Sequence, residues 1–508
     1  MKTFAAIYIG SYEISLKIFE LAAKKNIREI DHVRHRIELG RDVYSHGYIG
    51  YELTEKLCEM LQQFAGIMKE YRVDDYRLYC GPVIRDAENE LFLTDQIKRR
   101  TGLTVETLSN SEQRFISYKS VASREGFDEM TKESAAVVDV GGSSLQITLF
   151  IGGNVVTTQH LMIGTMRVRE KLAPIEKAVT HVEDQIEELV DKELEVFKAL
   201  YLQNREIKNV ILMGDYTVEL MRQVSKGKAM TVSSDTFIHY MNKLNRKNVE
   251  DIAEALKLSN DHDPLIVPAL VLFKRVVQEL NAQEIYVPGV NINDGIAYDY
   301  AESNHIVKPS HDFDEDILSA ARNMANRYWG YKTHINALTD MAVLIFDATK
   351  KIHGLGKRER LLLKTAAILH DCGKYVSLVN GARCSYDIIM ASEIIGLTHL
   401  EREIVARTVL YNSLPLDEYG EVADKLDRES YLVVAKLAAI LRISNAMDRS
   451  HKQKFKNVRA AVSGKKLVIT IESADDIVLE KGVFDSKSVF FEEVFSIKPV
   501  IRAKRVYN

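Results

Sequence analysis

Two short stretches carry residues whose types and spacing suit the binding of a phosphate group. In one of them, Asp139 precedes a turn made of Gly141, Gly142, Ser143 and Ser144. A carboxylate at a strand end can hold a hydrated Mg²⁺ ion, and glycines let backbone amides approach an anion closely. The same residues are also compatible with an ordinary hairpin that binds nothing. The stretch is therefore a candidate phosphate loop and magnesium site.

The other stretch repeats this layout at the N-terminus. Residues 4–9 form an apolar run that ends at Gly10 and Ser11, and residues 14–19 alternate like a returning strand. Two strand–turn–strand units at the starts of successive α/β regions indicate an internal duplication with a cleft between two lobes. Such a cleft is a natural site for a phosphorylated ligand.

A second constellation of chemical groups lies toward the C-terminus, at His334, His370, Asp371 and Asp448. All four lie on or directly after predicted helices with apolar faces, over residues 333–349, 361–369 and 431–449. Because buried carboxylates without partners are costly, these side chains are candidates for a divalent metal site. A lone histidine on an apolar face is more often a hydrogen-bonded core residue, so both interpretations stay open.

The elements around these residues indicate several domains, since 508 residues are too many for one hydrophobic core. Residues 52–72, 182–202 and 265–280 have helical periodicity, and residues 75–80 read as a strand. Residues 301–313 lose periodicity and contain Pro309. We expect two lobes at 1–128 and 129–303, a linker at 304–313, a helical domain at 314–455 and a small strand-rich subdomain at 456–508. Alternation over residues 467–472 and 488–491 predicts strands in that last part.

Composition restricts the partners and the compartment. The net charge of −4 provides no global attraction to nucleic acid or to an anionic membrane, so we expect neither as a partner. The four cysteines form no CxxC pair, which suggests reduced thiols. Residues 1–10 lack the apolar core of a signal peptide, and the longest apolar stretches are too short to span a bilayer. We therefore expect a cytoplasmic protein.

Several motifs in order along the chain resemble those of the Ppx/GppA family of exopolyphosphatases and guanosine pentaphosphate phosphatases. AAIYIGSYEI is similar to the first phosphate loop of the family, VVDVGGSSLQ to the second, and LSNSEQRFISYKSV to the segment that carries the catalytic glutamate. Arg85 matches the arginine of the A-T-S-A-L-R motif, and Arg167 that of the L-G-x-V-R segment. The resemblance implies a duplicated, actin-like (ribonuclease H-like) α/β core that uses Mg²⁺.

The activity that this resemblance implies is removal of the terminal phosphate of inorganic polyphosphate, or of guanosine pentaphosphate, by metal-assisted attack of water. Asp139 would hold the Mg²⁺, while the two loops with Arg85 and Arg167 would contact phosphates. Guanosine tetraphosphate is a related ligand. In this family a C-terminal helical domain is thought to bind polyphosphate or to form dimers, so a homodimer is expected.

Four positions depart from the family pattern. Gln113 stands where the catalytic glutamate is expected, Tyr8 replaces the aspartate of the first loop, Gln146 replaces a glutamate, and Asn293 replaces an arginine. Because glutamine cannot take a proton from water, the adjacent Glu112 becomes the candidate base. Glu112 can equally be read as a first-turn carboxylate that stabilises its helix. A protein that binds polyphosphate or a nucleotide without turnover is the alternative function.

The C-terminal constellation resembles a second family, the HD superfamily of metal-dependent phosphohydrolases. LHDCGK at residues 369–374 is similar to the L-H-D-I-G-K signature, and NAMDRS at 445–450 to the ending A-D-A-x-D-R-S. The resemblance implies an HD-like domain in which His334, His370, Asp371 and Asp448 bind a divalent metal. Hydrolysis at this second site is a further alternative.

Overall fold

The computed structural model describes residues 2–22, 27–174, 181–203, 205–258 and 264–505. The chain divides into two compact units, residues 1–312 and residues 313–508, which we call the N-terminal unit and the C-terminal unit. The candidate phosphate loops lie in the first unit, and the histidine constellation lies in the second.

The N-terminal unit begins with a five-stranded sheet of order β3-β2-β1-β4-β5. Strands β1 to β3 form an antiparallel meander, and β4 and β5 extend the sheet in parallel with β1. Its strands are β1 (Lys2–Ile9), β2 (Glu13–Leu21), β3 (Arg28–Arg36), β4 (Asp75–Cys80) and β5 (Glu106–Thr107). The helices that follow them are α1 (Leu39–His46), α2 (Tyr51–Glu70), α3 (Pro82–Arg85) and α4 (Glu90–Thr101).

A second sheet repeats this topology with one additional edge strand, in the order β10-β11-β9-β6-β7-β8. Strands β6 to β8 form the meander, and β9 and β11 run parallel to β6. Its strands are β6 (Ser134–Val140), β7 (Leu145–Ile151), β8 (Asn154–Leu161), β9 (Asn209–Gly214), β10 (Thr231–Ser233) and β11 (Glu284–Tyr286). The predicted duplication is confirmed, and the core has the actin-like α/β fold.

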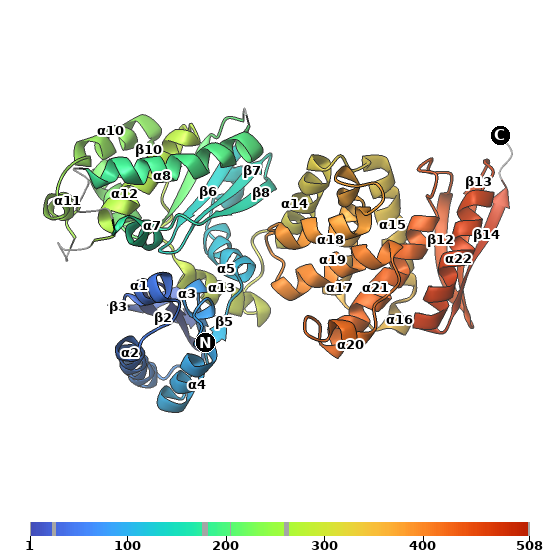
Figure 1. Ribbon diagram of the computed structural model, residues 1–508, viewed down its shortest axis with the longest axis horizontal. Coiled ribbons are helices and arrows are strands. Elements are labelled where there is room, and N and C mark those ends of the chain that lie inside the picture. The colour runs from blue at the N-terminus through green and yellow to red at the C-terminus, as the bar shows by residue number, and fades with distance from the viewer. Residues whose placement is uncertain (1, 23–26, 175–180, 204, 259–263, 506–508) are drawn as a thin grey trace. The chain divides into compact units, whose positions relative to one another are not determined.

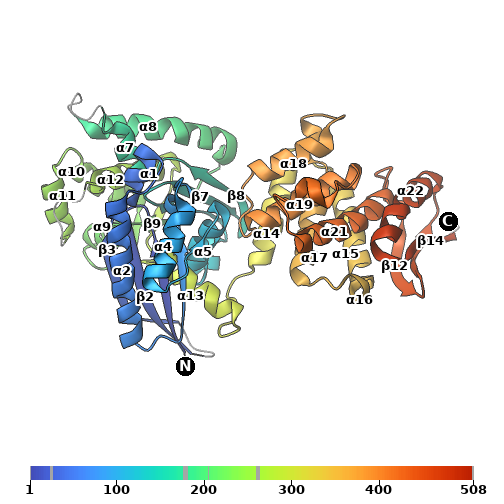
Figure 2. The ribbon, with the colours of Figure 1, turned by 60° about the horizontal axis from the view of Figure 1, so that its bottom comes forward.

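Helices cover both faces of each sheet (Figures 1 and 2). One face of the first sheet packs on α2 and α4, and one face of the second packs on α8 and α12, through clusters of buried apolar side chains. The helices of this second part are α5 (Asn110–Ala122), α6 (Phe127–Thr131), α7 (Thr165–Leu172), α8 (Val182–Phe197) with its π-helical extension η2 (Lys198–Leu202), α9 (Thr217–Val224), α10 (Ser234–Leu244), α11 (Val249–Leu256), α12 (Ile266–Glu279) and α13 (Ile292–Ser303).

Helices α5 and α13 lie on the opposite faces of the sheets, where the two lobes meet. Ile116 of α5 and Ile296 of α13 belong to one apolar cluster with Phe4 of β1. The two helices cross so closely that a Cβ atom on Gly295 would lie 2.0 Å from the carbonyl oxygen of Ile116. Glycine is therefore needed at this crossing, which fixes α5 against both lobes.

The C-terminal unit is a helical array that ends in a three-stranded sheet of order β12-β13-β14. Its helices are α14 (Phe313–Arg327), α15 (Lys332–Ala348), α16 (Lys350–His353), α17 (Lys357–Leu369), the 3₁₀-helix η3 (Cys372–Tyr375), α18 (Gly381–Ala391), α19 (His399–Ser413), α20 (Tyr419–Val422), α21 (Arg428–Ala446) and α22 (Val478–Phe495). Its strands are β12 (Lys456–Ser463), β13 (Lys466–Ser473) and β14 (Lys498–Arg505).

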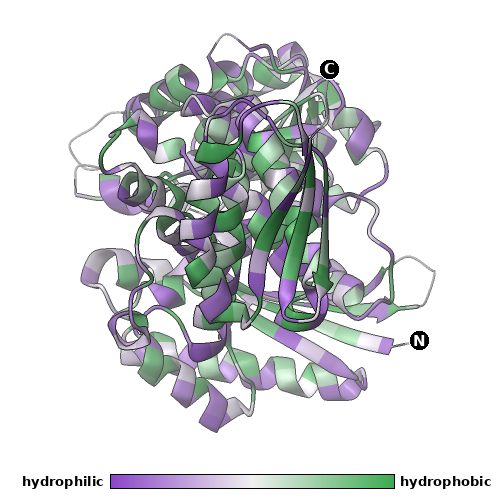
Figure 3. Ribbon diagram, turned by 90° about the vertical axis from the view of Figure 1, so that its right-hand side faces the viewer, coloured by the Kyte–Doolittle hydropathy of each residue, from purple (hydrophilic) through white to green (hydrophobic). Residues whose placement is uncertain are grey.

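The strand-rich end of this unit is confirmed, with one correction. Residues 467–472 lie in β13, where buried and more exposed side chains alternate, and Figure 3 shows hydrophobic and hydrophilic residues mixed along these strands. Residues 488–491, predicted as a strand, lie instead in helix α22. Phe484, Ser488, Phe491 and Phe495 are buried at spacings of three and four residues, and this helical period decides the structure.

Candidate functional site

The two candidate phosphate loops occupy equivalent places at the ends of β1 and β6. In the first loop the amide of Gly10 donates to the carbonyl of Glu13 (2.8 Å), and in the second the amide of Gly141 donates to the carbonyl of Ser144 (2.9 Å). A Cβ atom on Gly142 would lie 3.4 Å from Cβ of Ser11, so the loops face each other. The two loops, which have equivalent turns, therefore border the same cleft.

This cleft has a volume of about 390 Å³ and is lined by both lobes. All the predicted loop residues line it, namely Gly10, Ser11, Gly141, Gly142, Ser143 and Ser144. Asp139, Gln113 and Gln146 also line it, together with Ser117 of α5 and Asn293 of α13. Residues that lie more than 100 positions apart in the sequence therefore meet in one cavity.

Helix α7 supports the second loop from behind. The amides of Met166 and Arg167 donate to the carbonyl of Gly142 (3.0 and 3.1 Å), and that of Thr165 donates to Gly141 (3.0 Å). A Cβ atom on Gly164 would lie 2.2 Å from the amide nitrogen of Ser144, so only glycine allows this contact. The first amides of α7 therefore hold the loop in shape.

Asp139 lies at the floor of the cleft. Its carboxylate is half-buried and accepts a hydrogen bond from Ser117 Oγ of α5. Burial raises the pKa of Asp139, because a desolvated carboxylate is disfavoured, although the bond from Ser117 opposes this. A bound cation would favour the charged form again.

Tyr8 occupies the position in β1 that Asp139 occupies in β6, one residue before each strand ends. Its phenol lies so close to the chain that a Cβ atom on Gly81 would be 2.2 Å from the hydroxyl oxygen. Tyr8 is partly buried, and desolvation raises the pKa of its phenol well above the ordinary value. The first lobe thus contributes a neutral hydroxyl at this position. Of the two equivalent residues, Asp139 is the one with a carboxylate.

These residues fit a single Mg²⁺ ion that is shared with a ligand. Mg²⁺ is usually bound through one or two carboxylates together with substrate phosphates and waters. Asp139 would supply the protein ligand, and phosphate oxygens in the cleft would supply others. The ion would neutralise charge on the phosphate groups when bound.

The structure places Glu112 in the cap of helix α5, outside the lining of the cleft. Its carboxylate accepts a hydrogen bond from the amide of Ser109 (2.9 Å), while the amide of Glu112 donates to Ser109 Oγ (3.3 Å). This capping box begins helix α5 and turns Glu112 away from the cleft, where Gln113 lies instead. Successive residues of a helix point about 100° apart, so Glu112 and Gln113 point in different directions.

Arg85 and Arg167 do not line the cleft cavity, in contrast to their expected roles as phosphate ligands. Arg85 donates to the carbonyl of Leu108 (3.1 Å), to Asn110 Oδ1 (2.9 Å) and to Asp86 Oδ1 (3.0 Å). Arg167 donates to the carbonyl of Ser143 (3.1 Å) and lies 4.5 Å from the ring centroid of Tyr44.

The two arginines instead lie near one end of a row of polar residues on adjacent strands of the second sheet. We call Asp139, Gln146 and His160 the polar row. Asp139 pairs with Gln146, and Gln146 pairs with His160, on adjacent strands. Burial lowers the pKa of His160 to about 3, helped by the positive charges of Arg114, Arg167 and Arg85. The row therefore has its carboxylate at one end and three guanidinium groups near the other.

Sequence reasoning missed Arg114 at this end of the row. Arg114 is only 3% exposed and lies on α5 one turn before Ser117. The sequence feature that could have indicated Arg114 is its spacing of three residues from Ser117. This spacing places the two side chains on one face of the helix. Asn293, where the family has an arginine, is fully buried and donates to the carbonyl of Ala6 (2.8 Å), so it braces α13 on β1.

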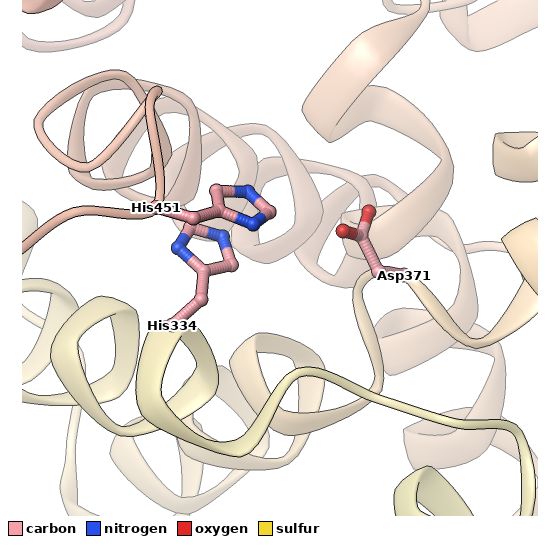
Figure 4. Close-up of side chains that lie close together, drawn as sticks. All are labelled: His334, Asp371 and His451. Carbon is pink, nitrogen blue, oxygen red and sulfur yellow. The ribbon is translucent and has the colours of Figure 1, made fainter.

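The C-terminal unit gathers all four residues of its predicted metal site. His334 Nδ1 lies 2.8 Å from Asp448 Oδ2, and His370 Nε2 lies 3.2 Å from Asp371 Oδ2. A residue that the sequence did not single out, His451, joins them in the turn after α21. His334, Asp371 and His451 each offer a ligand atom within 4.8 Å of the others, and Figure 4 shows the three side chains.

Comparisons with known proteins agree with the fold. The sequence profile of the Ppx/GppA phosphatase family matches residues 18–304, and that of Ppx/GppA phosphatase domain III matches residues 318–485. The chain belongs to the Ppx/GppA phosphatase family.

Individual relatives are more distant. A bifunctional 3-dehydroquinate synthase/phosphatase from Fusobacterium nucleatum is 27% identical over 259 residues, 49% of this chain and 37% of the relative. The chain thus spans just over a third of that relative's length.

Two solved structures share the fold of the N-terminal part. An exopolyphosphatase from Cytophaga hutchinsonii has a TM-score of 0.52 at 16% identity, covering 59% of this chain and 98% of that one. An exopolyphosphatase-like protein has a TM-score of 0.50 at 20% identity, covering 59% and 99%. Among the helices in the described ranges, none is both long and apolar enough to cross a membrane.

Proposed function

We propose that this protein is a phosphohydrolase that removes the terminal phosphate of inorganic polyphosphate or of guanosine pentaphosphate. The observation that carries the proposal is the meeting of two glycine-and-serine loops with Asp139 and Gln113 in one cleft of about 390 Å³. Membership of the Ppx/GppA phosphatase family supports the same reaction class.

The proposed roles follow from what phosphoryl transfer requires. Its transition state is loose, so catalysis depends on positioning and on neutralising charge more than on strong proton abstraction. Loop amides would hold the phosphate, and Asp139 with Mg²⁺ would offset its charge. Gln113 would orient the attacking water, as a glutamine does in some GTPases. A carboxylate base is therefore not essential, although its absence predicts slow turnover.

The polar row on the second sheet suggests how the rest of a phosphate chain would be bound. The guanidinium groups of Arg85, Arg114 and Arg167 act on His160, two strands from Asp139. An anion that extends from Asp139 along this row would meet increasing positive charge. This direction favours a linear polyanion over a compact monoester.

The experiment is a measurement of phosphate release from polyphosphate and from guanosine pentaphosphate in the presence of Mg²⁺. We expect release by the unaltered protein and a loss of on the order of 100-fold or more in Asp139→Asn. His370→Ala, which changes the C-terminal unit alone, is the matched control and should release phosphate normally. Equal activity in Asp139→Asn, or activity lost only in His370→Ala, would refute a reaction in the cleft.

A second candidate function is binding of polyphosphate or guanosine tetraphosphate without turnover. It is favoured by Tyr8 and Gln113, which stand where the family has carboxylates. The same experiment separates the two functions when direct binding is measured beside release. Binding that requires Asp139, with no phosphate released above background, identifies a regulatory protein.

A further inference from the structure

Two connecting segments of the C-terminal unit expose large apolar side chains to solvent. One segment lies between α14 and α15, and there Trp329 is 84% exposed. The other begins in η3 and continues to α18, and in it Leu378 is 85% and Val379 92% exposed. Single apolar side chains are common on protein surfaces, but a contiguous group of them is typical of a surface that binds something.

Contacts between aromatic rings place the two segments side by side. The ring centroids of Tyr328 in the first segment and Tyr375 in the second lie 5.8 Å apart, edge to face. Tyr331 stacks on His451 with 5.7 Å between centroids, and the charge of Lys374 acts on the same histidine. The exposed side chains of both segments thus form one surface, which we call the apolar patch: Trp329, Tyr331, Tyr375, Val376, Leu378 and Val379.

The segments that carry the apolar patch are basic. Residues 326–336 and 372–386 contain no aspartate or glutamate, although acidic residues outnumber basic ones in the whole chain, 72 to 68. The same two ranges contain four basic residues, namely Arg327, Lys332, Lys374 and Arg383. All four are exposed, including Lys374, which also pairs with Asp371 (2.6 Å). The patch is therefore complementary in charge to an anionic surface.

We propose that the apolar patch binds the surface of a membrane that contains anionic phospholipids. Tryptophan and tyrosine prefer the headgroup region of a bilayer, aliphatic side chains prefer its hydrocarbon, and lysine and arginine attract anionic headgroups. Residues 375–382 carry no charge, and Leu378 and Val379 are the most exposed members of the patch. These two side chains enter the bilayer, while the aromatic rings and the basic residues lie at its surface.

Two other occupants fit the patch less well. A soluble polyanion would use the basic residues and the aromatic rings, but it would leave Leu378 and Val379 in water. A second copy of the chain, bound through the same patch about a two-fold axis, would bring the basic residues of both copies together, and like charges in contact oppose association.

The proposal differs from the expectation, based on net charge, that no membrane is a partner. A net charge of −4 describes the average over the chain, whereas binding to a lipid surface depends on the residues that face it. A patch of this size predicts weak, reversible binding that added salt reduces.

The test uses the fluorescence of Trp329, which is the only tryptophan of the chain and reports on the patch without a label. The full-length protein is titrated with vesicles of phosphatidylcholine, and with vesicles of phosphatidylcholine and phosphatidylglycerol in equal amounts. With the mixed vesicles we expect the emission to shift to shorter wavelengths and the protein to sediment with the lipid. Vesicles of phosphatidylcholine alone should bind at least about tenfold more weakly.

A double variant tests the two side chains that enter the bilayer. Leu378→Asp with Val379→Asp should weaken binding to the mixed vesicles at least about tenfold, because charged groups do not enter hydrocarbon. Leu91→Asp is the matched control, since Leu91 is 80% exposed on α4 of the N-terminal unit, and it should bind like the unaltered protein.

Absence of binding to the mixed vesicles, equal binding to both kinds of vesicle, or unchanged binding in the double variant would each overturn the proposal. It would also be overturned if the emission shifted only with inorganic polyphosphate, the probe for a soluble polyanion. A shift that grows with protein concentration in the absence of lipid would instead identify a second copy as the occupant. Because phosphate release is not measured, the result is independent of the function proposed for the cleft.

Discussion

At the scale of residues, the cleft has neutral polar side chains at two positions where the family pattern has carboxylates. Tyr8 and Gln113 place a hydroxyl and an amide where carboxylates would bind metal and take a proton. Asp139 remains, half-buried and hydrogen-bonded to Ser117 Oγ. Under the proposed function, these residues would position a phosphate group, with fewer groups available to bind Mg²⁺ or to abstract a proton.

The effect of Tyr8 can be tested by restoring a carboxylate. In Tyr8→Asp, two carboxylates would face the ion, so the Mg²⁺ concentration that gives half-maximal phosphate release should fall by roughly tenfold. Tyr8→Phe is the matched control, because it removes the hydroxyl without adding charge, and it should leave the Mg²⁺ dependence unchanged. Identical Mg²⁺ dependence in all three proteins would show that this position is not near the ion.

His160 makes the stability of the N-terminal unit depend on pH. Its pKa is about 3 in the folded protein and 6.5 in the unfolded chain, so the unfolded state binds the proton more readily. Stability is therefore complete above pH 6.5 and falls as the pH decreases toward 3. Between pH 6.5 and pH 4 the loss from this residue should be roughly 3 kcal/mol.

This pH dependence can be measured by denaturant unfolding at several pH values. In His160→Gln, which keeps a polar side chain but cannot be protonated, the free energy of unfolding should vary less over this range. His32, whose pKa is lowered to about 4 mainly by burial, would account for part of the remaining slope. A slope that His160→Gln leaves unaltered would contradict the assignment.

At the scale of elements, helix α5 decides which residues reach the cleft. Its first turn is fixed by the capping box between Ser109 and Glu112, and this sets the rotation of every later side chain. Gln113 and Ser117 consequently face the cavity. Glu112 is thus important for the orientation of the helix and has no direct part in the proposed chemistry.

Substitutions of Glu112 should separate capping from catalysis. Glu112→Gln keeps a side-chain acceptor for the Ser109 amide and should preserve both stability and phosphate release. Glu112→Ala removes the cap and should lower the free energy of unfolding by about 1 kcal/mol. Thermal or denaturant unfolding beside the release assay measures both effects. Activity abolished in the stable glutamine variant would mean that Glu112 is the base after all.

The sequence predicted the loops well, because their properties are local. Gly10, Ser11 and the residues from Gly141 to Ser144 form turns whose shape depends on glycine and on neighbouring strands. The choice between Glu112 and Gln113 could not be predicted, since it depends on how the helix begins and on what packs around it. His451 was missed because its turn brings it to the cluster only after the chain has folded.

Alternation of residue types misled the prediction at the C-terminus. Residues 488–491 combine serine, valine and phenylalanine, which favour a strand when four residues are taken alone. Over the 18 residues of α22 the apolar positions recur with a helical period and meet helix α21 and strand β14. A window longer than two turns would have indicated the helix.

At the scale of the whole molecule, the chain consists of two compact units with separate hydrophobic cores. The proposed phosphate chemistry uses residues of the N-terminal unit, and the proposed membrane contact uses residues of the C-terminal unit. Each function can therefore be altered without changing the residues of the other.

Separation of the units leads to a prediction about fragments. Residues 313–508 bury their own apolar side chains from α14 to β14 and should unfold cooperatively when produced alone. Circular dichroism during thermal unfolding checks this, and a helical spectrum with one sharp transition is expected. A gradual, non-cooperative loss of signal would show that the C-terminal unit depends on the rest of the chain.

The central claim is that Gln113 faces the attacking water beside Asp139, and single-turnover release of phosphate from polyphosphate with Mg²⁺ tests it most directly. Gln113→Glu adds a proton acceptor at the same position and should raise the rate by at least about tenfold, whereas Gln113→Ala should lower it by a similar factor. If neither substitution changes the rate, while the binding of polyphosphate is preserved, the water is not oriented by this residue and the claim is contradicted.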